Sequence, residues 1–107
     1  MATGGRREGV DAKIKDWEQG LERLRLWLSN APEAVHLNHQ PQFVELYRRK
    51  EVVKSRWEAI RGVYRPAPEA IRRFEEAWAD METTWRDSQP LFAEMSTVRS
   101  QQGAVRS

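Results

Sequence analysis

Three residues match the spacing of a metal-binding motif: Glu33, His36 and His39, in the pattern E-x-x-H-x-x-H. Carboxylate oxygens and imidazole nitrogens are ligands that Zn²⁺ and similar ions accept. On a helix, spacings of three place these side chains along one side, but the first and last are nearly two turns apart. No fourth ligand is evident. The pattern therefore favours solvated side chains in a connecting segment, and we predict neither a bound metal nor a cofactor.

Catalytic residue types offer little more. The chain has no cysteine, which excludes thiol catalysis, thiolate metal sites and disulfides and is compatible with a reducing cytosol. Lys50 interrupts the apolar stripe of residues 43–64, at a position where the spacing predicts an apolar residue. A desolvated lysine amine can act as a nucleophile. More often such a lysine buries its alkyl stem or specifies helix register. Because no acid pair or nucleophile–base pair is fixed by local spacing, we predict that the protein is not an enzyme.

Tryptophan is abundant, with five residues in 107. Four of them lie on apolar stripes, where core filling is the simplest role for such large side chains: Trp17, Trp57, Trp78 and Trp85. Trp27 differs because it borders its apolar stripe. Its neighbour in sequence, Leu26, lies on the side of the helix opposite that stripe. Leu26 and Trp27 therefore form a candidate contact for self-association or for a partner helix.

Basic residues gather in the middle of the chain. Residues 41–65 contain seven Lys and Arg against three Glu, whereas residues 68–88 contain six acids against three Arg. Opposite charges on adjacent antiparallel helices would attract each other and fix their register. The alternative is a basic surface for phosphate groups, formed by Arg48, Arg49, Lys54, Arg56 and Arg61 and assisted by arginines near both ends. No helix-turn-helix pattern or base-stacking motif accompanies these charges.

Three amphipathic helices would carry these side chains. Residues 10–28 show apolar spacings of 4, 3, 4, 3 and 4, which is a heptad seam. After a connector over 31–40, a second helix is expected from Pro41, with a stripe that continues to Tyr64. A third begins near Pro68, and Pro90 predicts either a kink or a short separate helix.

These patterns predict an all-α protein, an antiparallel three-helix bundle with coiled-coil-like heptad seams. The bundle would span residues 10–95 as one domain, with disordered tails over 1–9 and 96–107. No run approaches the roughly 18 apolar residues of a membrane span, so we expect a cytoplasmic protein. Surface membrane association is not favoured, because the core needs the apolar face of each helix.

Several segments in fixed order resemble a group of small bacterial coiled-coil proteins, sometimes called stress-associated. Those proteins carry an aspartate-tryptophan step in an early helix and a repeated alanine-tryptophan step in a late one. The matching segments here are Asp16-Trp17, Tyr47-Arg48-Arg49-Lys50, the stretch 54–60, Phe74-Glu75-Glu76-Ala77-Trp78, and Trp85. The resemblance implies a helical structure and a bacterial cytosolic setting, without a mechanism.

The combined prediction is a non-enzymatic interaction or structural module that pairs with itself as a homodimer or with another helical protein. The alternative is a nucleic-acid-associated accessory protein that uses the basic second helix and the arginine-bearing tails. Salt dependence separates the two, because phosphate contacts release counterions.

Overall fold

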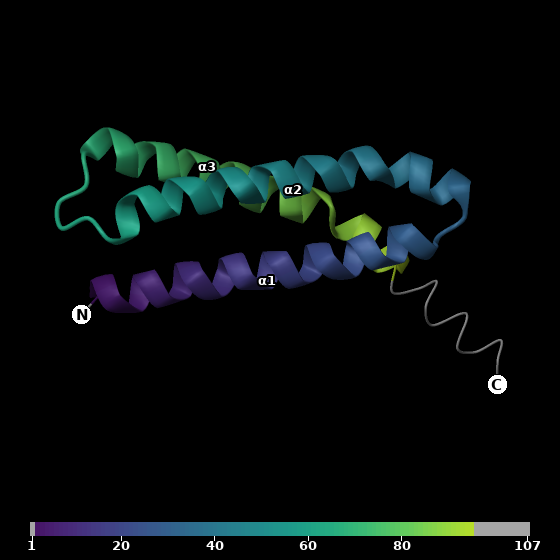
Figure 1. The fold of residues 1–107 in the computed structure, drawn as a ribbon, viewed down its shortest axis with the longest axis horizontal. Coiled ribbons are helices and arrows are strands. Elements are labelled where there is room, and N and C mark those ends of the chain that lie inside the picture. The colour runs from purple at the N-terminus through teal and green to yellow at the C-terminus, as the bar shows by residue number, and fades with distance from the viewer. Residues whose placement is uncertain (1, 96–107) are drawn as a thin grey trace.

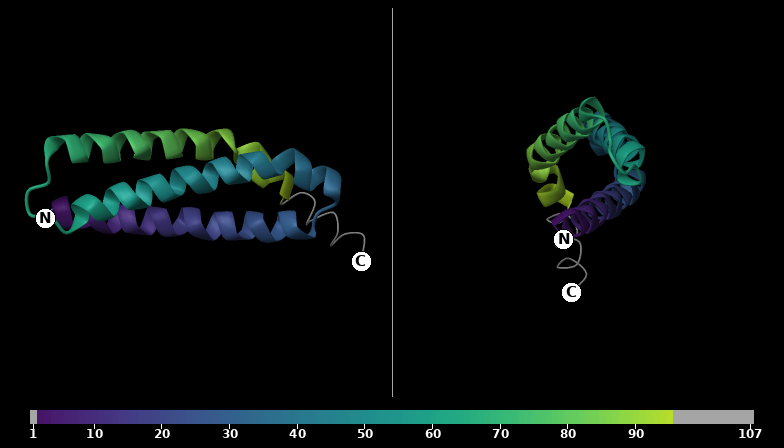
Figure 2. Two further views of the ribbon diagram at one scale, coloured as in Figure 1. Left: turned by 45° about the horizontal axis from the view of Figure 1, so that its top comes forward. Right: turned by 90° about the vertical axis from the view of Figure 1, so that its left-hand side faces the viewer.

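The computed structural model describes residues 2–95, with side chains from residue 9 onward, and this part of the chain contains helices and no strand. Three long helices follow one another: α1 (Ala2–Asn30), α2 (Glu33–Arg61) and α3 (Pro68–Asp87). A short helix over 89–95 comes after a turn at Ser88. The helices run antiparallel, and α2 packs against both α1 and α3 (Figures 1 and 2). The prediction of an all-α three-helix bundle is confirmed.

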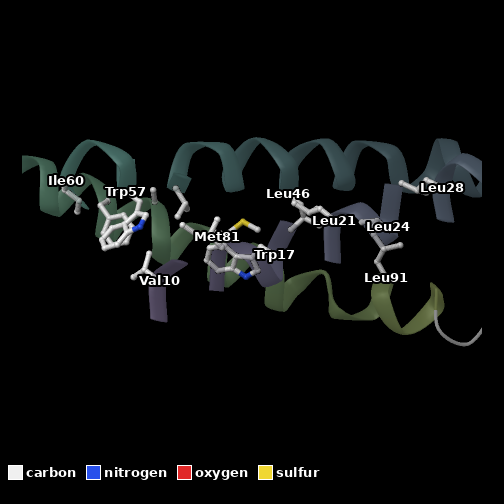
Figure 3. Close-up of a cluster of buried hydrophobic side chains, with 14 residues drawn as sticks. Val10, Trp17, Leu21, Leu24, Leu28, Leu46, Trp57, Ile60, Met81 and Leu91 are labelled. Carbon is white, nitrogen blue, oxygen red and sulfur yellow. The ribbon is translucent and has the colours of Figure 1, made fainter. Parts of the chain in front are cut away.

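The core is an apolar column along the inside of the bundle (Figure 3). The heptad seam predicted for the first helix is buried in full, namely Val10, Ile14, Trp17, Leu21, Leu24 and Leu28. Aromatic rings connect the three long helices, with centroid distances of 5.1 Å for Trp57–Phe74, 5.7 Å for Phe74–Trp78 and 4.9 Å for Trp78–Trp17. Burial of this column supplies most of the stabilising free energy, because each large apolar side chain contributes about 1.5–3 kcal/mol.

Two helices begin earlier than their apolar patterns predict. Residues 2–9, predicted as a tail, are the first turns of α1; no proline precedes Val10, so nothing local stops the helix. The connector predicted over 31–40 is mostly helical, because α2 begins at Glu33 and runs through Pro41. Pro41 removes one backbone donor, and packing on both sides of the proline holds the helix together. The predicted tail over 96–107 lies outside the described residues.

The second helix also ends earlier than its stripe suggests. It stops at Arg61, and the Gly62 N–H donates to the Ile60 carbonyl. Tyr64, which we expected at the end of the apolar stripe, therefore lies in the loop between α2 and α3 and is 91% exposed. Residues before a proline avoid the helical region, and Pro66 follows within four residues of Gly62.

The break before Pro90 takes the form of a short separate helix, one of the two predicted outcomes. The Ser88 N–H donates to the Thr84 and Trp85 carbonyls, and the Leu91 and Phe92 N–H groups donate to the Ser88 carbonyl. Pro90 is near the start of the new helix, where its missing N–H costs nothing. The buried Ser88 hydroxyl also accepts a hydrogen bond of 2.9 Å from Gln42 Nε2, which ties the turn to α2.

Gly20 lies where α1 meets α3. A methyl group built on Gly20 would lie 2.6 Å from Cη2 of Trp85, too close for a real Cβ. Glycine inside a helix normally costs about 1 kcal/mol relative to alanine. Here the absence of a side chain at position 20 allows the Trp85 indole to pack directly against the α1 backbone.

We expect Gly20→Ala to lower the free energy of unfolding by about 1–3 kcal/mol, because overpacking outweighs the gain in helix propensity. Gly9 is the matched control, since a Cβ there meets nothing within 4 Å. Gly9→Ala should therefore stabilise the protein slightly. Urea denaturation of both variants, repeated with Trp85→Phe, measures the coupling. A Gly20→Ala protein that gains as much stability as Gly9→Ala would contradict the close packing.

Candidate interaction surfaces

The three candidate metal ligands share one helix but do not converge. His36 Nδ1 lies 3.2 Å from the Leu28 carbonyl oxygen, across the α1–α2 turn. His39 Nε2 lies 3.2 Å from a carboxylate oxygen of Glu94 on the short helix, while Glu33 is exposed. Among the side chains that the structure describes, residues 9–95, no group of three acidic or histidine side chains is arranged to hold a metal ion. The structure uses the two histidines to fasten the turn and the short helix.

The candidate basic surface on α2 is largely paired with carboxylates. Arg48 and Arg49 both donate to Glu45 at 2.7 Å. Lys54 donates to Glu18 of α1 at 3.0 Å. Arg61 lies 3.7 Å from Asp11 of α1, and Arg49 also lies 3.8 Å from Asp80 of α3. Of the five candidate residues, Arg56 has no ion pair within the described part of the chain.

These pairs hold both partners in their charged forms. The hydrogen bond from Arg48 lowers the pKa of the Glu45 carboxyl and raises that of the arginine. In the same way, the hydrogen bond to Glu18 raises the pKa of the Lys54 ammonium. Since each cation faces a carboxylate at neutral pH, the field available to attract a phosphate backbone is reduced.

The charge attraction that we expected between the second and third helices accounts for few of the ion pairs among the described residues. One pair joins α2 to α3, Arg49–Asp80 at 3.8 Å, whereas α2 contacts acids of α1 through Lys54 and Arg61 at shorter distances. Within α3, Arg72 pairs with Glu69 and Glu76, and Arg73 pairs with Glu69. Helix-internal pairs of this kind contribute a few tenths of a kcal/mol each.

Lys50 is buried, with only 5% of its side chain exposed. Its ammonium contacts the Glu51 carboxylate, lies 3.7 Å from Glu18, and sits 4.3 Å from the centre of the Tyr47 ring. It borders a pocket of about 180 Å³ between α1 and α2, which is lined by Glu18, Leu21, Glu22, Arg25, Phe43, Tyr47 and Lys50. Because Lys50 is held by two carboxylates and an aromatic face, it fits a register-fixing role better than a nucleophilic one.

The structure separates Leu26 from Trp27. Leu26 is 48% exposed. Trp27 is half-buried, packs against the core and lies 5.9 Å from the His39 ring. Trp27 therefore packs against the core beside α2, and Leu26 alone stays as the exposed member of the predicted contact.

Two exposed apolar residues on α2 escaped the sequence analysis. Leu37 is 64% exposed and Val44 is 51% exposed. They are seven residues apart and so share one face of the helix, opposite the buried side chain of Leu46. Their seven-residue spacing in the sequence indicates this shared face. The prediction of a connector over residues 31–40 concealed it, because it left Leu37 outside the second helix. We call Leu26, Leu37 and Val44 the outer apolar residues, and we call the side of α2 that carries Leu37 and Val44 the outer face of α2.

Comparison with protein-family models, with curated proteins and with solved structures finds no match for this chain. The resemblance to small bacterial stress-associated proteins therefore stays a prediction. None of the described helices is long and apolar enough to cross a membrane.

Proposed function

We propose that this protein is a non-enzymatic interaction module that displays the outer face of α2 to a second helix, in the first instance that of another copy. The observation that carries the proposal is the exposure of Leu37 and Val44 on one helical face. Leaving such side chains in water costs about 25 cal/mol per Å² of apolar surface. Pairing around a two-fold axis would bury the same face on both chains.

The pairing of the basic residues supports this proposal over nucleic-acid binding. A phosphate-binding surface needs cations that are free to exchange counterions for phosphates. Three of the five candidates on α2, namely Arg48, Arg49 and Lys54, already donate to carboxylates at 3.0 Å or less, whereas Arg61 lies 3.7 Å from Asp11 and keeps half of its side chain exposed. The lack of cysteine suits a cytoplasmic setting, which we include in the proposal together with the stress-associated role that the resemblance implies.

The test is sedimentation over the micromolar range. We expect a concentration-dependent dimer that Leu37→Glu with Val44→Glu converts to monomer without loss of helicity. Leu26→Glu should weaken the dimer if α1 borders the contact. Ala79→Glu with Thr83→Glu on α3 is the control, because it adds the same two charges at other exposed positions.

A monomer at every concentration would remove self-association. A dimer that survives the α2 substitutions would exclude this face as the contact. Salt separates the alternative function: retention on DNA or RNA that falls steeply with ionic strength would favour a nucleic-acid role instead.

A further inference from the structure

The loop that joins α2 to α3, residues 62–67, carries two exposed large apolar side chains, one of which, Tyr64, is the most exposed among the described residues. Tyr64 is 91% exposed and Val63 is 47% exposed. We call this segment the tip loop, because it projects past the ends of all three long helices (Figures 1 and 2). A flat surface approaching this end of the bundle would therefore meet the tip loop, which carries Val63 and Tyr64.

The tip loop is short and conformationally restricted. The N–H groups of Gly62 and Val63 both donate to the Ile60 carbonyl. Pro66 and Pro68 fix their own φ angles, and Ala67 between them is extended at φ −60° and ψ 141°. The exposed side chains are thus presented in advance, so that contact with a surface costs little ordering entropy.

The charge around the tip loop is basic. No acidic residue occurs between Ala59 and Pro68, whereas Arg61 and Arg65 flank the apolar pair. The Arg65 guanidinium lies 5.6 Å from the centre of the Tyr64 ring. The nearest acids in sequence are Glu58, one turn back on α2, and Glu69, which Arg72 and Arg73 neutralise. Arg61 keeps half of its side chain exposed beside its 3.7 Å contact with Asp11.

From this arrangement we propose that the tip loop docks on an anionic lipid surface, with Val63 and Tyr64 in the interfacial region and Arg61 and Arg65 at the lipid phosphates. Tyrosine suits this position because its ring is apolar and its hydroxyl is polar. Basic side chains next to an anionic bilayer add about 1 kcal/mol each. The helices need their apolar faces for the core, but the tip loop takes no part in it.

A protein groove of the kind that binds polyproline segments is a poorer fit. Such grooves read an extended helix of several residues. Here the extended stretch is only Ala67 between two prolines, and Pro68 is already the first residue of α3.

The first experiment is flotation of the full chain with phosphatidylcholine vesicles, with and without 30% phosphatidylserine. We expect binding to the anionic vesicles only, lowered about tenfold or more by Val63→Ser with Tyr64→Ser. Arg61→Gln and Arg65→Gln should each lower it about fivefold. The control is Tyr47→Ser, which removes an exposed aromatic side chain of α2 that the proposed dimer contact does not use, and which should leave binding unchanged. Thermal unfolding shows that each variant is folded.

The second experiment uses the absence of cysteine. In one variant, Val63→Cys is labelled at its single cysteine with an environment-sensitive fluorophore in the tip loop. In a second variant, Leu37→Cys is labelled with the same dye on α2. Anionic vesicles should shift the emission to the blue at position 63 and not at position 37. No binding at millimolar lipid, an equal loss of binding in the Tyr47→Ser control, or equal shifts at both positions would overturn the proposal. Loss of dimer, rather than of lipid binding, in the Val63→Ser, Tyr64→Ser protein would overturn it in favour of a protein contact.

Discussion

Trp17→Ala is expected to lower the free energy of unfolding by about 3–5 kcal/mol, the range typical of buried tryptophan truncations. Trp17 is 1% exposed and packs against Trp78 at 4.9 Å, so its loss leaves a cavity where α1 meets α3. Trp57→Ala should cost a similar amount, because Trp57 is 8% exposed and contacts Phe74. Chemical denaturation followed by circular dichroism measures both. Either variant within about 1 kcal/mol of the parent would contradict its place in the core.

The phenylalanine variants separate packing from hydrogen bonding. Trp57 Nε1 donates to Asp11 at 2.8 Å, whereas the buried Nε1 of Trp17 has no acceptor among the described residues. Trp57→Phe therefore loses a hydrogen bond and volume, and Trp17→Phe loses only volume and an unsatisfied donor. We expect Trp17→Phe to recover most of the stability lost in Trp17→Ala. Asp11→Ala should cost less in Trp57→Phe than in the parent, since the indole donor is already gone.

Lys50→Glu is expected to lower the free energy of unfolding by about 3–5 kcal/mol, because it places an uncompensated charge in a buried position. The new carboxylate would face Glu18 and Glu51, the two acids that now contact the lysine ammonium. Equilibrium unfolding in urea at neutral pH measures the loss.

Lys50→Met is the matched control for that charge. Methionine keeps much of the stem's volume, and a buried ion pair replaced by apolar atoms is often neutral or stabilising. Glu18 and Glu51 are partly exposed, and Glu18 keeps Lys54, so neither acid is stranded. We expect Lys50→Met to lie within about 1 kcal/mol of the parent. A loss as large as that of Lys50→Glu would mean that the ammonium itself holds the fold.

The apolar repeat by itself determined the bundle and most of its core. The 4-3 spacing from Val10 to Leu28 admits one buried face on a helix, and the structure buries that face completely. Pro68 as the first residue of α3 and the break before Pro90 also followed from local chemistry, since proline lacks the N–H that a helix interior needs.

Only the tertiary structure decided which residues are covered by another helix. Gly20 reads as a weak point in α1 until the Trp85 indole is seen lying on it. Trp27 borders its apolar stripe in the sequence, and only the structure shows that it packs against the core and beside the His39 ring of α2. Pro41 reads as a helix start, yet α2 continues through it. The physical reason is the same in each case: packing between segments distant in sequence outweighs local preferences of about 1–3 kcal/mol, and such contacts leave no periodic signal in the chain.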